Sequence, residues 1–551
     1  MDILALSRLA RFRDIVGVLF KYGFDDVAER LQLPGMALIN KTRVVLPEMS
    51  TWERLRHAME DLGPTFVKFG QILSLRGDLL PGDLINELEK LQDSVAPVPL
   101  DEIMGVLKKA LGKPLDEIFS LIEEEPLAAG SLAQVHRAVL KEENLPVALK
   151  IRRPDIVKTV EIDLQILEGA APHLSEHLEF ARTYDFVNLV KELKRALLRE
   201  LNFTLEARNM QIISQNMAGE KDVIIPEVYE SWTRPSVLTM DLIDGVKLKD
   251  LNPEKIEEHG QLAQTGLRVV VKQVLENGFF HADPHPGNFL VVEDKQLCLI
   301  DWGVVGILPS ETRYELVELI SAIGDMEAEK VFDILVSLTA ANVAQINERL
   351  LLRDILEILH LYHSVPVGKL DLGQLLMDLN SMLRTHHIKL PSDLALMFKT
   401  MVTAEGTARR FYPELDVIAE IEPFVRRLGT ERWKPSQVWR RLSRQLRFYF
   451  KLQSNLPGAI QRILQKIEQG DLNIKFRHEN LGGLQKSLDN VSNRLSFSII
   501  LASLIIGSSM IITTGVKPLI FGYPAIGLVG YLISAFLGII VVISIFRSRK
   551  F

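Results

Sequence analysis

The sequence predicts an α+β protein of two lobes, with a helical extension before the lobes and a membrane-spanning helical hairpin after them. Residues 121–303 combine short apolar runs, typical of strands, with longer patterns of helical period. Residues 310–425 show helical patterns alone, and two long uncharged apolar runs follow near the C-terminus. A mixed lobe, a helical lobe and a terminal hairpin together explain these observations.

The stretch His281–Gly303 carries the most chemical information. It begins with the acidic loop HADPHPGN, continues as a hairpin of two apolar strands, and ends in DWG. Protein-kinase-like folds place a catalytic-loop Asp, a metal-binding Asn and a second metal-binding Asp in this order. Mg²⁺ prefers hard oxygen ligands of this kind. We therefore expect Asp283 to be catalytic, and Asn288 and Asp301 to hold Mg²⁺.

Two other interpretations of this loop stay open. In the first, Asp283 caps a turn and His281 is a hydrogen-bonded core histidine. In the second, the H-x-D-x-H pattern of His281, Asp283 and His285 ligates a transition metal. Such sites usually recruit further ligands, and the other close histidine pair is His386 with His387.

Residues 126–153 predict a strand, a tight turn, a strand, a loop and a third strand. The third strand contains VALK, which matches the kinase strand whose Lys, here Lys150, meets the α- and β-phosphates of ATP. The turn lies where a kinase places its phosphate-covering loop, in which small residues let backbone N–H groups approach phosphate. The cofactor-binding residues expected there are Ala128, Ala129, Gly130 and Ser131.

Two further parts of a nucleotide site can be placed from the sequence. Residues 223–250 predict two strands and a hinge, and backbone groups near Asp241 and Ile243 are expected to meet adenine. A helical Glu should pair with Lys150. Residues 155–217 look helical throughout and offer Glu200 and Glu206, with Glu161 as an outsider, and spacing alone does not choose among them.

The segment after Gly303 is short. Only VVGILP separates Gly303 from the next helical pattern, which Ser310 is well placed to cap. A protein kinase needs a long activation segment to hold a peptide substrate, so this spacing argues against an ordinary Ser/Thr protein kinase.

Composition sets broader limits. The net charge of -7 argues against nucleic acid as a main partner. Cys298 is the one cysteine, so no intramolecular disulfide can form, which fits a reducing compartment. The N-terminus shows no signal-peptide pattern, and residues 4–32 predict an amphipathic helix. Residues 51–93 predict two more helices, with Lys68 and Gln71 close on one face.

With these parts assembled, the chain resembles the UbiB/AarF-type atypical kinase-like family from about Thr51 to Pro309, and in its C-terminal layout. The motifs are K-x-G-Q at residues 68–71, AAGSLAQVH, VALK and HADPHPGN. The resemblance implies that Lys68 and Gln71 belong to an extension that occludes the peptide-binding region. It also implies that Lys150 touches phosphates and pairs with Glu200.

Two positions depart from the family pattern. Glu200-Leu201-Asn202 stands where the family usually has E-x-D, which puts an electrostatic pairing of Asn202 with Lys68 in doubt. Gly130 stands third in a loop that usually reads A-A-A-S. Because glycine permits closer and more flexible backbone approach, we expect this loop to behave more like an ordinary Gly-rich kinase loop.

The resemblance implies an ATP- or ADP-binding, Mg²⁺-dependent ATPase or phosphotransferase that supports isoprenoid-quinone (ubiquinone) synthesis. Implied partners are membrane lipids and a quinone precursor or quinone-biosynthesis enzymes, and a homodimer is compatible with the sequence. A non-catalytic, ATP-gated lipid chaperone or scaffold is the main alternative. A protein kinase and a metalloenzyme are the others.

The C-terminal end predicts contact with a membrane. Leu495–Thr514 and Ile526–Phe546 are long enough and apolar enough to span it, with Ser503/Gly507 and Ser534/Gly538 as pairs for close helix packing. A buried helical hairpin is the alternative. The flanking basic residues Arg494, Arg547, Arg549 and Lys550 place both ends and the catalytic domain on the cytoplasmic side of the inner membrane.

A basic and aromatic region precedes these runs and fits either a solvated helix face or contact with anionic lipid. Its residues are Arg426, Arg427, Arg432, Trp433, Lys434, Trp439, Arg440, Arg441, Arg444, Arg447, Phe448, Tyr449, Phe450 and Lys451. The expected domains are the extension (1–120), the mixed lobe (121–245), the helical lobe (246–425), the basic region (426–493) and the hairpin (494–551).

Overall fold

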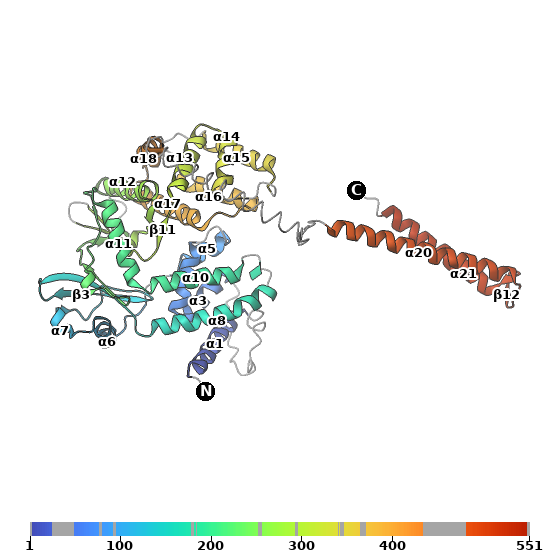
Figure 1. Cartoon of the computed structure of the whole chain (residues 1–551), viewed down its shortest axis with the longest axis horizontal. Helices are drawn as coiled ribbons and strands as arrows, with labels where there is room; N and C mark the ends of the chain where they lie inside the picture. The colour runs from blue at the N-terminus through green and yellow to red at the C-terminus, as the bar shows by residue number, and fades with distance from the viewer. Residues whose placement is uncertain are drawn as a thin grey trace, which may run out of the picture. The chain divides into compact units, whose positions relative to one another are not determined.

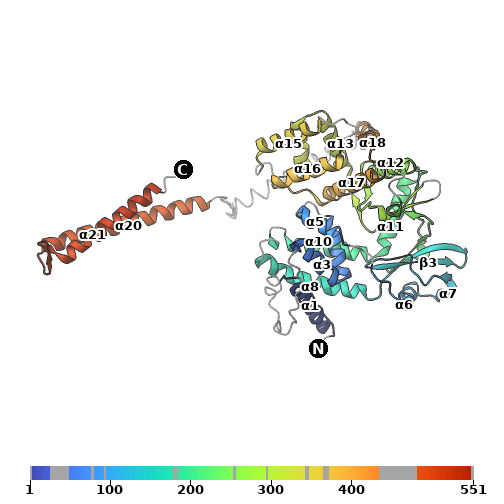
Figure 2. The ribbon, with the colours of Figure 1, turned by 180° about the vertical axis from the view of Figure 1, so that it is seen from behind.

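The computed structural model describes residues 3–24, 49–75, 80–91, 95–177, 181–182, 185–251, 256–292, 296–339, 341, 346–363, 371–432 and 481–547. These residues belong to two compact units, Met1–Arg441 and Leu442–Phe551 (Figures 1 and 2). Each unit is described by itself.

A five-stranded antiparallel sheet forms the first lobe, in the order β1-β3-β4-β6 with β2 also paired to β3. Its strands are β1 (Phe119–Ile122), β2 (Ala128–Ala129), β3 (Ala133–Leu140), β4 (Leu145–Arg152) and β6 (Val237–Asp241). In β4 the buried side chains of Val147, Leu149 and Ile151 join a cluster with α6 (Leu100–Leu111). Because side chains alternate along a strand, Lys150 faces the other side of the sheet.

Among the described residues, the helices α8 (Ile156–His177), α10 (Phe186–Glu200) and α11 (Phe203–Met217) follow β4. α8 and α10 lie side by side in both views (Figures 1 and 2). The helical pattern breaks at Leu201 and Asn202, and the Asn202 side chain caps α11 by accepting a hydrogen bond from the Thr204 N–H at 3.2 Å. This break gives α11 a direction independent of α10.

A second sheet of four strands has the order β5-β10-β9-β7, and β8 pairs with β11 beside it. The strands are β5 (Val223–Ile224), β7 (Val246–Lys247), β8 (Phe279–His281), β9 (Phe289–Val291), β10 (Leu297–Leu299) and β11 (Val305–Ile307). Short turns of 3-10 helix lie at η2 (Glu230–Trp232), η3 (Leu248–Asp250) and η5 (Pro286–Asn288). The β9–β10 register brings Ile300 opposite Asn288, and the Ile300 N–H donates to the Asn288 carbonyl at 3.0 Å.

The helical lobe packs around one large apolar core that also includes α11. Its helices are α12 (Ile256–Lys272), α13 (Ser310–Gly324), α14 (Ala328–Thr339), α15 (Glu348–His363), α16 (Leu372–Thr385), α17 (Ser392–Phe411) and α18 (Val417–Arg432). A π-helical turn, η4 (Gln273–Asn277), ends α12 and leads into β8. This lobe therefore supports the start of the acidic loop.

The N-terminal extension is helical, as expected. It comprises α1 (Ile3–Lys21), α3 (Thr51–Leu62), α4 (Pro64–Ser74), α5 (Gly82–Leu88), α6 and α7 (Leu115–Ile118). A β-carbon at Gly70 would lie 2.2 Å from Leu91 Cδ1, so the glycine permits close packing at that point. The buried Asp163 carboxylate of α8 accepts hydrogen bonds from the Arg11 guanidinium at 2.7 and 3.0 Å, which fastens α1 to the mixed lobe.

The extension also contacts the helical lobe. Arg384 of α16 donates to the Leu80 carbonyl at 3.2 Å, and Lys399 of α17 forms an ion pair with Glu89, which follows α5. The extension is therefore bonded to both lobes.

The C-terminal unit is a pair of packed helices, α20 (Leu481–Thr513) and α21 (Ala525–Arg547), joined through β12 (Leu519–Ile520) and β13 (Tyr523–Pro524). A β-carbon at Gly530 would lie 2.1 Å from Ser508 Oγ, so these two residues mark the close approach. The expected role of Ser503 in helix packing is wrong, because its side chain is exposed, whereas Ser534 is buried.

Within the part of the chain that the structure describes, one helix has the length and hydropathy to cross a membrane. It is Leu495–Thr513, with a mean hydropathy of 2.2, and the apolar stretch Ala525–Gly538 is shorter. The basic and aromatic residues from Trp433 to Lys451 lie outside the described residues, as do Arg549 and Lys550. Their expected contact with lipid stays a prediction.

Packing between β8 and β11 generates a prediction. A β-carbon at Gly306 would lie 2.1 Å from Cζ of the fully buried Phe280 ring. We expect Gly306→Ala to destabilise the protein by about 1–3 kcal/mol through overpacking. Thermal unfolding of the full chain in detergent should show a lower Tm. Adding Phe280→Leu should cost less than the sum of the single substitutions, since it makes room.

Gly169→Ala is the matched control, because nothing lies within 4 Å of a β-carbon built at that exposed helical position. Its Tm should stay equal or rise, since alanine favours helix over glycine. An equal loss of Tm in both alanine variants would contradict the packing at β8 and β11.

Candidate active site

The Lys150 ammonium lies between two carboxylates. Its Nζ donates to Glu206 Oε1 and Oε2 at 2.8 and 3.0 Å, and to Asp301 Oδ1 at 3.1 Å. The Phe203 ring covers the same ammonium, 5.6 Å from its centroid. Three segments far apart in the sequence therefore meet at one cation.

The charges in this cluster shift one another's pKa values. Burial opposes the charge on Lys150, but Asp301 and Glu206 outweigh it, so the pKa of Lys150 lies above its ordinary range. The Lys150 ammonium, and beyond it that of Lys68, holds the pKa of Asp301 well below its ordinary range. Burial raises the pKa of Glu206 to about 7, against the opposing charge of Lys150. Asp301 is therefore firmly ionised.

One face of α11 holds the first of these carboxylates in place. Phe203 and Glu206 lie one helical turn apart, and Asn209 follows at the same spacing. The Asn209 amide donates to the Trp302 carbonyl at 2.9 Å, directly after Asp301. Phe203 and Asn209 were not predicted from the sequence, although their spacing from Glu206 would place them on its face of a helix that begins after Asn202.

The expectation that Lys150 pairs with Glu200 is wrong. Glu200 ends α10, before the break, and forms an ion pair with Lys68 of α4. A β-carbon at Gly303 would lie 3.8 Å from Glu200 Cγ, so this second ion pair lies beside the DWG turn. Asn202, whose pairing with Lys68 was in doubt, caps α11.

The other K-x-G-Q residue has a different contact. Gln71 donates from Nε2 to the Leu91 carbonyl at 3.3 Å, which is a bond within the extension. Lys68, in contrast, interacts electrostatically with Asp301 and lowers the pKa of its carboxyl group. The predicted occluding role of Lys68 and Gln71 stays a prediction.

The DWG turn aims the Asp301 carboxylate back toward Lys150. Asp301 has a φ of 62°, in the left-handed region that Asp tolerates better than most residues. Trp302 is fully buried, and its Nε1 donates to the Leu299 carbonyl at 3.2 Å. The Asp301 side chain stays 48% exposed, so one side of the carboxylate is open to a ligand.

The acidic loop is held by its own hydrogen bonds. The Asn288 amide donates from Nδ2 to the Asp283 carbonyl at 3.1 Å. The Asn288 Oδ1 is on the opposite side of the amide from this bond. The Asp283 side chain is 42% exposed. Asn288 and Asp301 each flank the β9–β10 hairpin, whose register places their backbones on neighbouring strands. The acidic loop thus offers the Asn288 amide oxygen and the Asp283 carboxylate, and the DWG turn offers the Asp301 carboxylate.

His281 is buried and fully used by the protein. Its Nδ1 accepts from the Asp283 N–H at 3.1 Å and its Nε2 lies 3.4 Å from the Ile300 carbonyl. Burial lowers the pKa of His281, which fits a neutral ring with the proton on Nε2. Two residues missed by the sequence argument also hold this segment: Gln273 accepts from the His281 N–H at 2.9 Å, and Thr400 donates to the Ala282 carbonyl at 3.2 Å.

These contacts weigh against the H-x-D-x-H metal interpretation. No group of three His, Cys, Asp or Glu residues is arranged to hold a metal ion within the described ranges. His285 Nδ1 accepts from the Gly287 N–H at 3.0 Å, and His386 pairs with Asp354 at 2.9 Å. His281, which is a satisfied core histidine, has both ring nitrogens engaged by protein groups.

The small-residue loop begins with β2 and reaches β3 through a tight turn. Gly130 donates from its N–H to the Ala133 carbonyl at 2.8 Å, so this N–H is already used within the turn. Ser131 is buried, 1% exposed. Ala128 and Ala129 pair with Val135 and Gln134 of β3. The expected flexibility of Gly130 is therefore limited by bonds inside the protein.

The predicted hinge lies at the end of β6. Asp241 pairs with Val147 of β4, and its carboxylate accepts from the Tyr229 hydroxyl at 2.6 Å and the Glu227 N–H at 3.0 Å. The Asp241 N–H also donates to the Glu227 carbonyl at 3.0 Å, so Asp241 fixes the strand end with both its side chain and its backbone. The contact of backbone groups near Asp241 and Ile243 with adenine stays a prediction.

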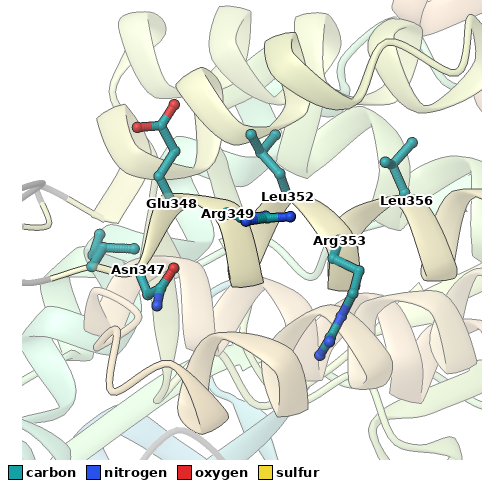
Figure 3. Close-up of a pocket in the computed structure, with 7 residues that line it drawn as sticks. Asn347, Glu348, Arg349, Leu352, Arg353 and Leu356 are labelled. Carbon is teal, nitrogen blue, oxygen red and sulfur yellow. The ribbon is translucent and has the colours of Figure 1, made fainter.

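A separate hollow lies on α15 and the residues before it, lined by Ile346, Asn347, Glu348, Arg349, Leu352, Arg353 and Leu356 (Figure 3). None of the residues of the Lys150 cluster lines it, and its polar groups are ordinary for a helix surface. This hollow is therefore separate from the candidate site around Lys150 and Asp301.

Comparison with known proteins shows the family. The model of the ABC1 atypical kinase-like domain matches residues 90–335, the UbiB helical domain residues 355–416, and the ABC1/UbiB kinase-like C-terminal domain residues 479–547. The probable protein kinase UbiB of Tolumonas auensis is 33% identical over 84% of this chain and 87% of its own length. The chain belongs to the UbiB-type atypical kinase family.

Two further similarities complete the comparison. An uncharacterized protein in the hydrogenase 1 5′ region of Clostridium pasteurianum is 30% identical to this UbiB-family chain, over 98% of it and 99% of that protein. A solved complex of Rv3197 with erythromycin, from Mycobacterium tuberculosis, has a TM-score of 0.45 and 21% identity, covering 65% of this chain and 87% of that chain. The family places the Lys150 cluster in a kinase-like domain of mixed α+β content.

The two glutamates generate a prediction that separates their roles. Glu206→Gln should weaken Mg-ADP binding at least tenfold, because Lys150 would lose one of its two carboxylate partners and be drawn toward Asp301 alone, whereas Glu200→Gln should leave both partners of Lys150 in place. Isothermal titration of both purified variants measures this. A larger loss of affinity in Glu200→Gln than in Glu206→Gln would contradict the assignment.

Proposed function

We propose that this UbiB-family protein binds Mg-ATP, or Mg-ADP, at Lys150 and acts as a membrane-anchored ATPase or as a phosphotransferase to a small or lipid-like acceptor. The observation that carries the proposal is the buried Lys150 ammonium held by Glu206 and Asp301. Phosphoryl transfer needs mostly positioning and charge neutralisation, which a cation fixed beside the open Asp301 carboxylate can supply.

The residues fit a bound Mg²⁺. Asp301 is ionised and partly open, and the Asn288 amide nitrogen is engaged, so that its oxygen is the group left for a ligand. These two side chains would hold the metal, which when bound offsets phosphate charge. Lys150 would lie against the phosphates. The exposed Asp283 would orient the nucleophile, or accept its proton, and in an ATPase that nucleophile is water.

The segment after Asp301 favours water or a small acceptor over a peptide. Val305–Ile307 pairs with β8, and α13 begins at Ser310, so this short segment is tied to a strand. A long activation segment is therefore lacking between Asp301 and α13, where every residue is described. This arrangement makes an ordinary protein kinase the least favoured of the phosphotransferase functions.

Membrane attachment and a quinone pathway complete the proposal. Leu495–Thr513 is 6% buried and apolar, which suits a helix anchored in the cytoplasmic membrane with α21 as its partner. The family resemblance connects the protein with isoprenoid-quinone synthesis, and relatives carry the name probable protein kinase UbiB. Membrane lipid, a quinone precursor or quinone-biosynthesis enzymes would be its partners.

A second function is an ATP-gated lipid chaperone or scaffold without turnover. The bonds from the extension to both lobes favour it, because they hold the two lobes in one arrangement around the site. Slow ATP hydrolysis that vesicles of anionic lipid do not stimulate, despite tight nucleotide binding, would support this alternative.

Nucleotide binding generates the next prediction. Mg-ADP at about 100 times its Kd should add about 2.7 kcal/mol of stability and raise the Tm of the wild-type protein. Asp301→Asn should abolish the Mg²⁺-dependent part of this shift, because a neutral amide is a poorer Mg²⁺ ligand. Thermal unfolding with and without Mg²⁺ measures both.

The exposed Asp333 of α14 offers a matched control, and Asp333→Asn should keep the full shift. A wild-type protein whose Tm ignores Mg-nucleotide would overturn the proposed site. Equal shifts in wild type and Asp301→Asn would remove Asp301 from the metal site.

A further inference from the structure

The chain just before α6 lies against the small-residue loop. This stretch, Val95–Val98, forms the linker between the first helices of the extension and α6. The Val95 N–H donates to the Ala129 carbonyl at 3.3 Å. The extension is thus bonded to the backbone of the loop that would cover the phosphates.

Gln134 makes a second connection to the linker. Its side chain is fully buried on β3, next to the loop. Its Nε2 donates to the Val98 carbonyl at 3.3 Å, and its Oε1 accepts from the Val98 N–H. The amide therefore pairs with one linker residue as a neighbouring strand would, and a buried amide with both ends satisfied is a firm contact.

Arg153 makes the third connection, and it joins the loop and the linker directly. Its Nε donates to the Gly130 carbonyl at 2.8 Å. Its Nη2 donates to the Ala96 carbonyl at 3.0 Å, with the Val95 carbonyl at 3.4 Å. The flat guanidinium has several donors in a fixed fork, so one side chain can hold both segments.

The loop has little freedom once these bonds form. The N–H of Gly130 is bonded within the turn and its carbonyl is bonded to Arg153. The Arg153 N–H also donates to the Leu132 carbonyl at 2.9 Å. A phosphate-covering loop without such bonds could open freely to release nucleotide. Here the bonds of Gly130 and Arg153 hold the loop in place.

We propose that Arg153 is a positioning residue that, with Gln134, fastens the nucleotide loop to the linker and so slows nucleotide release. This inference rests on the proposed function, because it takes residues 128–131 to cover the phosphates. Nucleotide exchange then requires the linker and the loop to part. The N-terminal extension therefore controls how long nucleotide stays bound, through the bonds to the linker.

Stopped-flow dissociation of a fluorescent ADP analogue with Mg²⁺, from the full-length protein in detergent, tests the kinetic part. Arg153→Gln should raise the dissociation rate about tenfold, the loss expected for one or two charge-assisted hydrogen bonds. Arg153→Lys should give an intermediate rate, since it restores the charge and one donor but not the fork. Arg137→Gln, at an exposed position on β3, should leave the rate unchanged.

Hydrogen exchange of the nucleotide-free protein tests the fastening by itself. The Val95 and Val98 amides should exchange faster in Arg153→Gln than in wild type, while amides of α14 should not change. If Arg153→Gln disturbed folding in general, its amides would exchange faster everywhere and the Tm of the nucleotide-free variant would fall. Arg153→Lys would then replace it in both experiments.

The two experiments separate failure of this inference from failure of the proposed function. Unchanged dissociation and unchanged linker exchange in Arg153→Gln would overturn the inference while nucleotide binding stands. If wild-type protein binds no nucleotide, the proposed function and the kinetic part are both overturned. Unchanged linker exchange in Arg153→Gln would then overturn the bond between loop and linker as well.

Discussion

The buried ammonium of Lys150 is the interaction on which the arrangement of this protein depends. A charge removed from water costs several kcal/mol unless it is paired and hydrogen-bonded. Glu206 and Asp301 supply those partners, and they come from α11 and from the end of the β9–β10 hairpin. Both lobes must therefore assemble correctly around β4 before the charge is satisfied. The same geometry leaves one carboxylate open for a metal.

The N-terminal extension contributes charge to this electrostatic centre. Lys68 pairs with Glu200 beside the DWG turn, and its charge adds to that of Lys150 in lowering the pKa of Asp301. The two ammonium groups therefore stabilise the ionised Asp301 carboxylate, and Asp301 in turn stabilises the charge on Lys150. Together with the linker bonds to the loop, this makes the extension part of the proposed nucleotide site.

The sequence predicted those parts of the site whose residues are close along the chain. VALK, the small-residue loop and HADPHPGN each carry their own local pattern, and the α+β class follows from periodicity. The partner of Lys150 could not be chosen, because the break at Asn202 interrupts α10 and α11 without a proline or glycine to mark it. Contacts of Arg153 and Gln134 join residues far apart in sequence, and spacing carries no signal for them.

The most direct measurement is an experimental structure of the full chain with Mg²⁺ and a non-hydrolysable ATP analogue. We predict metal density against Asp301 and Asn288, phosphate against Lys150, and a Lys150–Glu206 contact that survives nucleotide binding. A nucleotide bound elsewhere, or Lys150 paired with Glu200 in place of Glu206, would contradict the central role of this buried ion cluster.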